Sequence, residues 1–301
     1  MSSPVIAVDL GGSKIAVALV VDGAIVVRRE APTRAEVGQE AVLEIIVDLV
    51  TPWRSEAHSI CVAATGHVRA GTVSTVNPGT LVGWRGYPLA KLLTTRVGLP
   101  VVLLNDAHAA AWGEWRYGAG RGTRDFAFVT ISTGVGAGII AGGALQTGST
   151  GLAGHVGFWS DTAPEAGEDS FLESYASGTA VARAAARHVG SVTTREVFEL
   201  AERGDARAEA VIRRAVYRMA RALLNLRWLL DPERVAIGGS VGLSPGYLPR
   251  LLAVLADIAA DQPLTIVPAQ LGRDAGLFGV ADWAAAEPSG AVSADETSYA
   301  G

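Results

Sequence analysis

The fold is decided by the stretch VVLLND at residues 101–106, which AHAAAW follows at residues 107–112. An unbroken apolar run of strand length is typical of a buried parallel strand, and the alanine-rich segment after it indicates a helix. Asn105 and Asp106 therefore stand at a strand-to-helix switch, and in an open α/β sheet that edge binds ligands. Both residue types are also ordinary helix N-caps, because their side-chain oxygens accept hydrogen bonds from the first N–H groups of a helix.

The composition is that of a globular protein of about two domains. The chain has 301 residues, of which 49% are hydrophobic and 18% charged, enough to bury a sizeable core. A net charge of −5 gives no basic surface for nucleic acid or an anionic membrane. The single cysteine, Cys61, lies in an apolar run, which excludes a disulfide framework. The sequence shows neither a signal peptide nor an apolar run of about 18 residues, so we expect a cytoplasmic protein.

The N-terminal part is predicted as a strand, a glycine-rich turn and a hairpin, since Asp22-Gly23 is a strong hairpin signal. Before residue 101, the pattern of apolar residues predicts strands at 5–9, 15–21, 24–28 and 60–64 and helices at about 36–53 and 88–97. The glycine- and proline-rich residues 71–90 predict a loop with an extended start.

The same succession recurs after the segment 117–122, which is the most linker-like part of the chain. The second half is predicted to contain strands at 126–131, 137–141, 234–237 and 264–267, a further short strand after Gly142-Gly143, and helices over 178–230, on both sides of the last strand and at about 274–286. We therefore expect an internal duplication of architecture. The predicted division is a smaller lobe at 1–117, on which the helix 274–286 packs, a larger lobe at 118–273, and a disordered tail at 287–301.

Three glycine-rich turns follow predicted strands: DLGGSK at 9–14, STGVG at 132–136 and GGS at 238–240. The first two can bring backbone N–H groups against phosphate oxygens, and the third leaves room for a flat purine. Each turn can equally be an ordinary connection between elements. Asp9 is harder to explain in that way, because a carboxylate at the end of a buried strand needs a partner. Hydrated Mg²⁺ or Lys14 would serve.

Six motifs in this order resemble the ROK family of sugar kinases: DLGGSK, NDAHAAAWGE, STGVGAGI, GLAGHVG, LESYASG and IGGSVG. The resemblance spans about residues 5–286, and six ordered motifs are far more specific than one. It implies an actin-like, ribonuclease-H-like fold of two α/β lobes with mixed sheets and a cleft between them. Within the family, the chain is most similar to the bacterial N-acetylmannosamine kinases, through TGHVRAGTVSTVNPG, GLAGHVG, GGSVGLSPGYL and RDAGLFG.

The resemblance also implies the role of each matching residue. Asp106 matches the catalytic base, which takes the proton of the sugar 6-hydroxyl. The sugar-binding positions are Gly66, Asn77, Asn105, Asp106, His155 and Glu173. The positions that bind ATP are Asp9, Gly11, Gly12, Ser13, Lys14, Thr133, Gly134, Gly136, Gly238 and Gly239, with Mg²⁺ near Asp9. The implied assembly is a homodimer.

Two positions depart from the pattern of many family members. ROK glucokinases carry Glu at the position of His155, and a neutral His, with one donor and one acceptor nitrogen, suits a 2-acetamido sugar. Many members also hold a structural zinc ion with one His and three Cys. Here Phe158 stands at the His position and the segment 157–173 contains no Cys, so such a zinc site cannot form. We expect Phe158, Trp159 and Phe171 to pack this loop instead.

The leading hypothesis is ATP-dependent phosphorylation of N-acetylmannosamine at its 6-hydroxyl, as in sialic acid catabolism. A ROK glucokinase or another N-acylhexosamine kinase is the alternative. A transcriptional repressor of the family is not expected, because only eight residues precede Asp9 and the net charge is negative. A non-catalytic sugar-binding regulator or a structural actin-like protein is less consistent with Asp106 and two phosphate-type turns.

Overall fold

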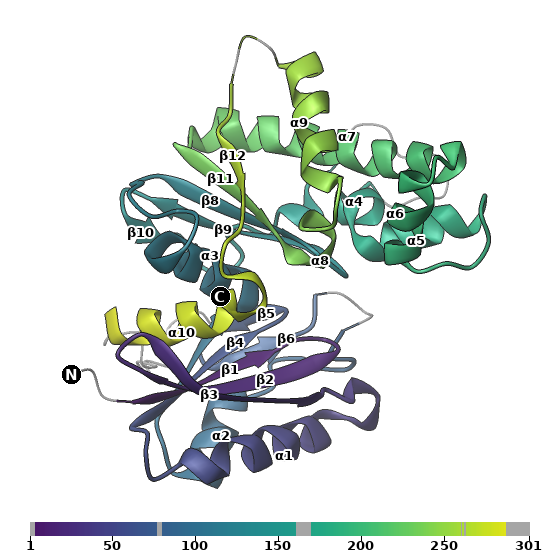
Figure 1. The fold of residues 1–301 in the computed structure, drawn as a ribbon. Coiled ribbons are helices and arrows are strands. Elements are labelled where there is room, and N and C mark those ends of the chain that lie inside the picture. The colour runs from purple at the N-terminus through teal and green to yellow at the C-terminus, as the bar shows by residue number, and fades with distance from the viewer. Residues whose placement is uncertain (1–3, 77–79, 161–169, 260, 262, 287–301) are drawn as a thin grey trace, which may run out of the picture. The chain divides into compact units, whose positions relative to one another are not determined.

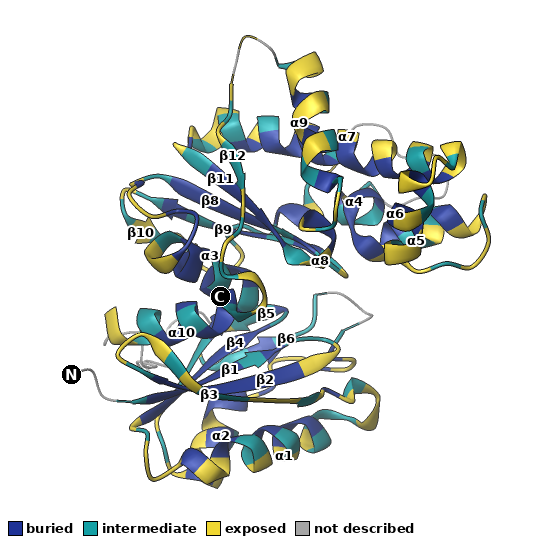
Figure 2. Cartoon of the chain, viewed as in Figure 1, coloured by how far each residue is buried: buried dark blue, intermediate teal, exposed yellow. Residues whose placement is uncertain are grey.

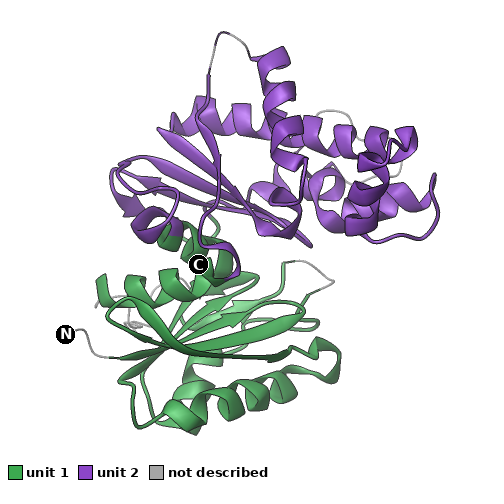
Figure 3. Cartoon of the chain, viewed as in Figure 1, with its two compact units in different colours: residues 1–113, 148–152, 274–301 green, residues 114–147, 153–273 purple. Residues whose placement is uncertain are grey.

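The computed structural model describes residues 4–76, 80–160, 170–259, 261 and 263–286, so Asn77 and the predicted tail lie outside the described residues. Two compact units divide the chain (Figure 3): unit 1 comprises residues 1–113, 148–152 and 274–301, and unit 2 comprises 114–147 and 153–273. The division after residue 113 falls inside helix α3 (Asp106–Tyr117). Among the described residues, no helix is long and apolar enough to cross a membrane.

Unit 1 contains a five-stranded mixed sheet in the order β3-β2-β1-β4-β7 (Figure 1). Its strands are β1 (Val5–Leu10), β2 (Lys14–Val21), β3 (Ala24–Pro32), β4 (Ser59–Ala64) and β7 (Val101–Asn105). The strands β1, β2 and β3 are antiparallel, and the hairpin predicted at Asp22-Gly23 is confirmed, with φ of 49° and 75° at its two turn residues. The strands β1, β4 and β7 are parallel, so their carboxyl ends meet at one edge.

The two faces of this sheet carry side chains of different size. Large apolar residues such as Ile6 and Val8 fill one face, against α1 (Gln39–Val50) and α2 (Leu89–Val97). The short 3-10 helices η1 (Ala35–Val37) and η2 (Thr51–Trp53) flank α1. The other face carries mostly small residues, and α10 (Ala275–Ala286) contacts it along β1 and β4. A Cβ on Gly279 of α10 would overlap the Ala109 carbonyl of α3, so glycine permits this close helix crossing.

Part of the loop predicted at 71–90 is regular structure. The strands β5 (His67–Arg69) and β6 (Thr72–Ser74) pair as a small antiparallel sheet around Ala70-Gly71, whose residues have φ of 46° and 74°. Strands of three residues are too short to give an alternating pattern, which is why the sequence did not indicate them.

Unit 2 repeats the strand order of unit 1, as β10-β9-β8-β11-β12, and confirms the predicted internal duplication (Figure 1). Its strands are β8 (Phe126–Ile131), β9 (Val135–Ala141), β10 (Ala144–Leu145), β11 (Arg234–Gly238) and β12 (Ile266–Pro268). In each five-stranded sheet the first three strands in chain order pair antiparallel in succession, and the remaining two run parallel to the first.

The helical region predicted at 178–230 consists of three helices: α5 (Gly178–Ala186), α6 (Thr194–Glu202) and α7 (Ala206–Leu230). Thr193 and Glu196 form a capping box that begins α6, and Asp205 caps α7. With α4 (Glu173–Ala176) and α9 (Tyr247–Ile258), these helices cover one side of the unit 2 core, as the buried faces in Figure 2 show. The remaining short helices are η3 (Val156–Phe158), α8 (Gly239–Gly242) and η4 (Gly272–Asp274).

The segment 117–122, predicted as a linker, is buried in its middle and exposed at its two ends. Its residues Gly118, Ala119 and Gly120 are buried. The fully buried carboxylate of Glu114 accepts hydrogen bonds from the backbone N–H of Ala119 at 2.8 Å, and from those of Gln270 and Leu271. A glycine-rich stretch looks flexible in sequence, but here it allows the chain to approach Glu114 closely.

Candidate active site

The predicted site residues of unit 1 lie at the carboxyl edge of its parallel strands. Asp9 is the last residue but one of β1 and pairs with Ala63 of β4, Gly66 follows β4, and Asn105 ends β7 opposite Ala64 (Figure 1). This is the edge at which ligands bind in open α/β sheets. The topology therefore brings together residues that are nearly 100 positions apart in the sequence.

Asn105 connects this edge to helix α3. Its Oδ1 accepts hydrogen bonds from the N–H groups of Ala107 and His108, at 3.0 and 3.1 Å, so it is the N-cap of the helix. Its Nδ2 donates to the Gly66 carbonyl at 2.9 Å and to Asp106 Oδ1 at 3.0 Å. The buried Asn105 amide therefore both caps α3 and holds the Asp106 carboxylate in place.

Burial raises the pKa of Asp106 from 3.8 to about 6, although hydrogen bonds from Ala107, Thr65 and Asn105 act in the opposite direction. A helix N-terminus favours the ionised form of Asp106, but burial is the larger effect, so its pKa lies above that of an ordinary aspartate. Thr65 was missed as a site residue, although its position directly after β4, at the ligand-binding edge, could have indicated it.

Burial is also the main cause that raises the pKa of Asp9, from 3.8 to about 7, and the charge of Asp106 adds to it. Lys14 and Arg28 lower the same pKa. Gly276, in the first turn of α10, is next to this carboxylate, since a Cβ there would be in ordinary contact with Asp9 Oδ2, at 3.5 Å. A desolvated carboxylate beside a second one is a typical feature of functional sites, because it gains most from a bound cation.

The turn between β1 and β2 holds the predicted ATP-binding residues of unit 1. Gly11 donates a backbone hydrogen bond to the Lys14 carbonyl at 3.0 Å, and the Thr33 hydroxyl donates to the Gly11 carbonyl at 2.7 Å. Ser13 and Lys14 are exposed, and a Cβ on Gly12 would lie 2.8 Å from a methyl group of Thr80. Glycine at position 12 is therefore required by a contact inside the chain.

In unit 2, Glu173 lies against the turn between β8 and β9. Its Oε2 accepts a hydrogen bond from the Val135 N–H at 2.8 Å, and a Cβ on Gly134 would lie 2.5 Å from the same oxygen. Thr133 is exposed in this turn, and Gly136 pairs with Thr130 inside the sheet. The structure thus brings a predicted sugar-binding carboxylate to a predicted phosphate turn.

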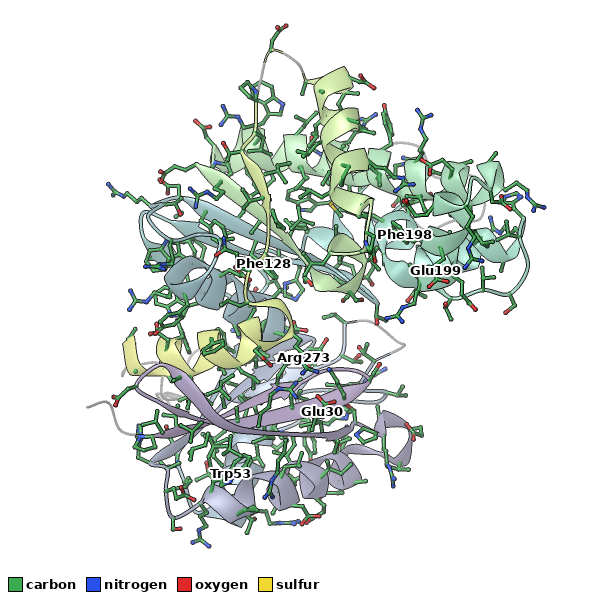
Figure 4. All side chains as sticks on the ribbon, in the orientation of Figure 1. Glu30, Trp53, Phe128, Phe198, Glu199 and Arg273 are labelled. Atoms are coloured by element: carbon green, nitrogen blue, oxygen red, sulfur yellow. The ribbon has the colours of Figure 1, made fainter. Side chains whose placement is uncertain are left out.

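Gly238 and Gly239 lie at the same edge of the unit 2 sheet, because Gly238 pairs with Thr130 of β8. A Cβ on Gly238 would lie 2.5 Å from the Phe128 ring, which is labelled on β8 in Figure 4. Gly239 has φ of 83°, and a Cβ there would overlap the Ile131 carbonyl. Side chains are thereby excluded from this turn.

His155 directly precedes η3, and its ring stacks on Phe158 with 6.4 Å between centroids. Phe158 in turn meets Phe171 edge-on at 5.6 Å, and Trp159 packs against the unit 2 core. The expected aromatic contacts are therefore present between Phe158 and Phe171, whose side chains are 37% and 38% exposed, while residues 161–169 of this loop lie outside the described residues.

The sequence pattern of the ROK family matches residues 5–287. The chain belongs to the ROK family. The ROK glucokinase from Streptomyces griseus, solved in complex with glucose and AMPPNP, is 30% identical with a TM-score of 0.79, and the match covers 93% of this chain and 98% of that one. The predicted actin-like α/β fold of ROK kinases is thereby confirmed.

Among the relatives of this ROK protein, the N-acetylmannosamine kinase of Escherichia coli O1:K1 is 38% identical over 92% of this chain and 96% of its own length. The bifunctional enzyme NanE/NanK of Brucella melitensis biotype 1 is 42% identical over 94% of this chain and 54% of its own length. The chain therefore spans about half the length of the bifunctional relative.

Proposed function

We propose that the chain is an ATP-dependent sugar kinase that phosphorylates the 6-hydroxyl of N-acetylmannosamine. The observation that carries the kinase activity is the Asp106 carboxylate, held by Asn105 at the ligand-binding edge with a pKa of about 6. The choice of sugar is supported by the similarity to the E. coli N-acetylmannosamine kinase. The proposal includes a homodimer, the assembly that family resemblance implies.

Asp106 acts as the general base. Its ionised carboxylate accepts the proton of the sugar 6-hydroxyl while that oxygen attacks the γ-phosphoryl group of ATP. The raised pKa makes it a stronger base than an ordinary aspartate, yet leaves it mostly ionised at pH 7. The sugar is held by Gly66, Asn77, Asn105, His155 and Glu173, whose amide, imidazole and carboxylate groups suit a ring of hydroxyls.

The residues around Asp9 fit Mg²⁺·ATP. Mg²⁺ prefers carboxylate oxygens and keeps several waters, so one or two carboxylates suffice together with the phosphates. Asp9 would hold the cation, and bound Mg²⁺ supplies charge neutralisation of the phosphates. The proposed ATP contacts are Gly11, Gly12, Ser13, Lys14, Thr133, Gly134, Gly136, Gly238 and Gly239.

The pH dependence of kcat/KM for the sugar tests the base. At saturating Mg²⁺·ATP we expect a plateau at neutral pH and a fall of about tenfold per pH unit below about 6, because the protonated carboxyl cannot accept the substrate proton. An aspartate with its ordinary pKa would place this fall near 4. Initial rates between pH 5 and 8 distinguish the two cases, and constant kcat/KM down to pH 5 would contradict the assignment.

The sugar is tested by an ADP-release assay with N-acetylmannosamine, N-acetylglucosamine, glucose and mannose. We expect N-acetylmannosamine to have the highest kcat/KM, by at least about tenfold over glucose, because a site built to pair with the acetamido group rejects a sugar that lacks it. A preference for glucose would instead assign the chain as a glucokinase and remove the proposed role of His155 in recognising the acetamido group.

A further inference from the structure

Arg28 lies at the centre of a polar network on the face of the unit 1 sheet that α10 contacts. Its Nε donates to Asp274 Oδ1 at 2.9 Å, and its Nη1 donates to Glu30 Oε2 at 2.8 Å. Glu30, labelled in Figure 4, also lies 3.7 Å from the Lys14 ammonium. One guanidinium therefore connects the residue before α10 to the proposed phosphate turn.

The strand register places Arg28 on the same face of the sheet as Asp9, two strands away and in the neighbouring row. The row Ala7, Ala18, Arg28 crosses the sheet next to the row Asp9, Ala16, Glu30, and both rows project on one face. The neighbouring Arg29 projects on the opposite face, where its guanidinium lies 5.2 Å from the centre of the Trp53 ring. The two adjacent arginines thus have separate surroundings.

The burial of Arg28 is costly. Its side chain is only 17% exposed, and its Nη2 is buried with no hydrogen-bond partner among the described residues. Leaving a buried donor unsatisfied is destabilising, so an arginine is a poor choice here for stability alone. What it provides is a planar fork that fixes two carboxylates at once.

Each of the two carboxylates, Asp274 and Glu30, lies next to a segment that carries a proposed ATP contact. Asp274 immediately precedes α10, and Gly276 in the first turn of that helix lies against the Asp9 carboxylate. Glu30 lies beside Lys14 in the turn that follows Asp9. A displacement of Arg28 would therefore loosen the first turn of α10 over Asp9 and release Lys14 at the same time.

We propose that Arg28 is a positioning residue for the nucleotide, which holds Asp9 and Lys14 through Asp274 and Glu30 in the places where they bind Mg²⁺·ATP. This rests on the proposed function, because it takes Asp9 and Lys14 as ATP contacts. Arg28 itself does not touch the nucleotide. Its loss therefore acts on the affinity for ATP and leaves the affinity for the sugar unchanged.

The test compares Arg28→Gln, Arg28→Lys and Asp274→Asn with Arg29→Gln as the matched control. We expect Arg28→Gln and Asp274→Asn to raise the KM for Mg²⁺·ATP about tenfold, the usual effect of removing a residue that orients a ligating group. The KM for the sugar should change less than about twofold, as should both constants in Arg29→Gln. Arg28→Lys, which keeps the charge but lacks the fork, should recover only part of the loss.

A merely structural Arg28 would lower the melting temperature and the active fraction, and so kcat, with the KM for ATP unchanged; that result would overturn the proposal. The double variant, Arg28→Gln with Asp274→Asn, should raise the KM for ATP no more than either single variant, because the two residues act through one contact. An increase equal to the product of the two single increases would also overturn the proposal. Calorimetric binding of Mg²⁺·ADP provides a readout that needs no turnover. If the wild type binds Mg²⁺·ADP but phosphorylates no sugar, the proposed function fails, while the same variants still test Arg28 by the affinity for ADP.

Discussion

Replacing Asp106 by Asn is expected to lower kcat by about 10²–10⁴, the usual contribution of a general base. The asparagine has nearly the same shape, so it occupies the same place beside Asn105. It has no basic oxygen at neutral pH, however, and cannot accept the proton of the sugar 6-hydroxyl. The KM for each substrate should change much less than kcat, because the contacts with bound sugar and ATP are kept.

The fold should survive this substitution for a specific reason. Asn105 Oδ1 accepts hydrogen bonds from the N–H groups of Ala107 and His108, and Asp106 Oδ1 accepts a further one from Ala107 that an amide oxygen at position 106 can also accept, so the start of α3 is kept. Removal of a desolvated carboxylate should leave the melting temperature of the ligand-free protein unchanged or higher. Asp48→Asn, at an exposed position of α1, is the matched control and should keep full activity. Full activity in Asp106→Asn itself would refute its role as the base.

Glu114→Ala is expected to lower the free energy of unfolding by roughly 3–5 kcal/mol, which is among the largest effects of a single substitution. The carboxylate is fully buried and accepts backbone hydrogen bonds from Ala119, Gln270 and Leu271. An alanine would leave these N–H groups without their acceptor and would open a cavity next to Gly118. The segment 117–122 should then become as flexible as its composition suggests.

Urea unfolding followed by circular dichroism measures this change. Glu199→Ala serves as the control, because Glu199 is exposed on α6 next to the buried Phe198 (Figure 4), and it should change stability by no more than about 0.5 kcal/mol. The free energy of unfolding of Glu114→Gln should lie between those of Glu114→Ala and Glu199→Ala. The glutamine keeps one acceptor oxygen but places an amide donor opposite backbone donors. Equal unfolding midpoints for Glu114→Ala and Glu199→Ala would show that the network contributes little.

The features that the sequence predicts well are those that local chemistry determines. The apolar run of β7 and the alanines after it placed Asn105 and Asp106 at a strand-to-helix switch, and Asp22-Gly23 marked the hairpin of unit 1. The duplicated strand order followed from the recurrence of strand, glycine-rich turn and strand. Each of these signals lies within a few consecutive residues.

The features that escaped prediction depend on partners far apart in the chain. Glu114 binds Gln270, which is 156 residues away, and Arg28 binds Asp274, which is 246 residues away. No periodicity within a segment indicates such a pair. The pKa of Asp106 is a similar case, because the helix N-terminus can be predicted from sequence but the degree of desolvation, which is the larger effect, cannot.

The buried cysteine of β4 allows the opening of unit 1 to be measured by thiol labelling. Cys61 pairs in the strand register with Ala7, on the sheet face that α10 contacts, and burial raises the pKa of its thiol to about 11. A thiol-specific reagent needs both access and thiolate, so it reacts only with molecules in which this sheet has opened. Since the chain contains no other cysteine, the labelling rate measures the opening of unit 1 separately from unit 2, without an engineered probe.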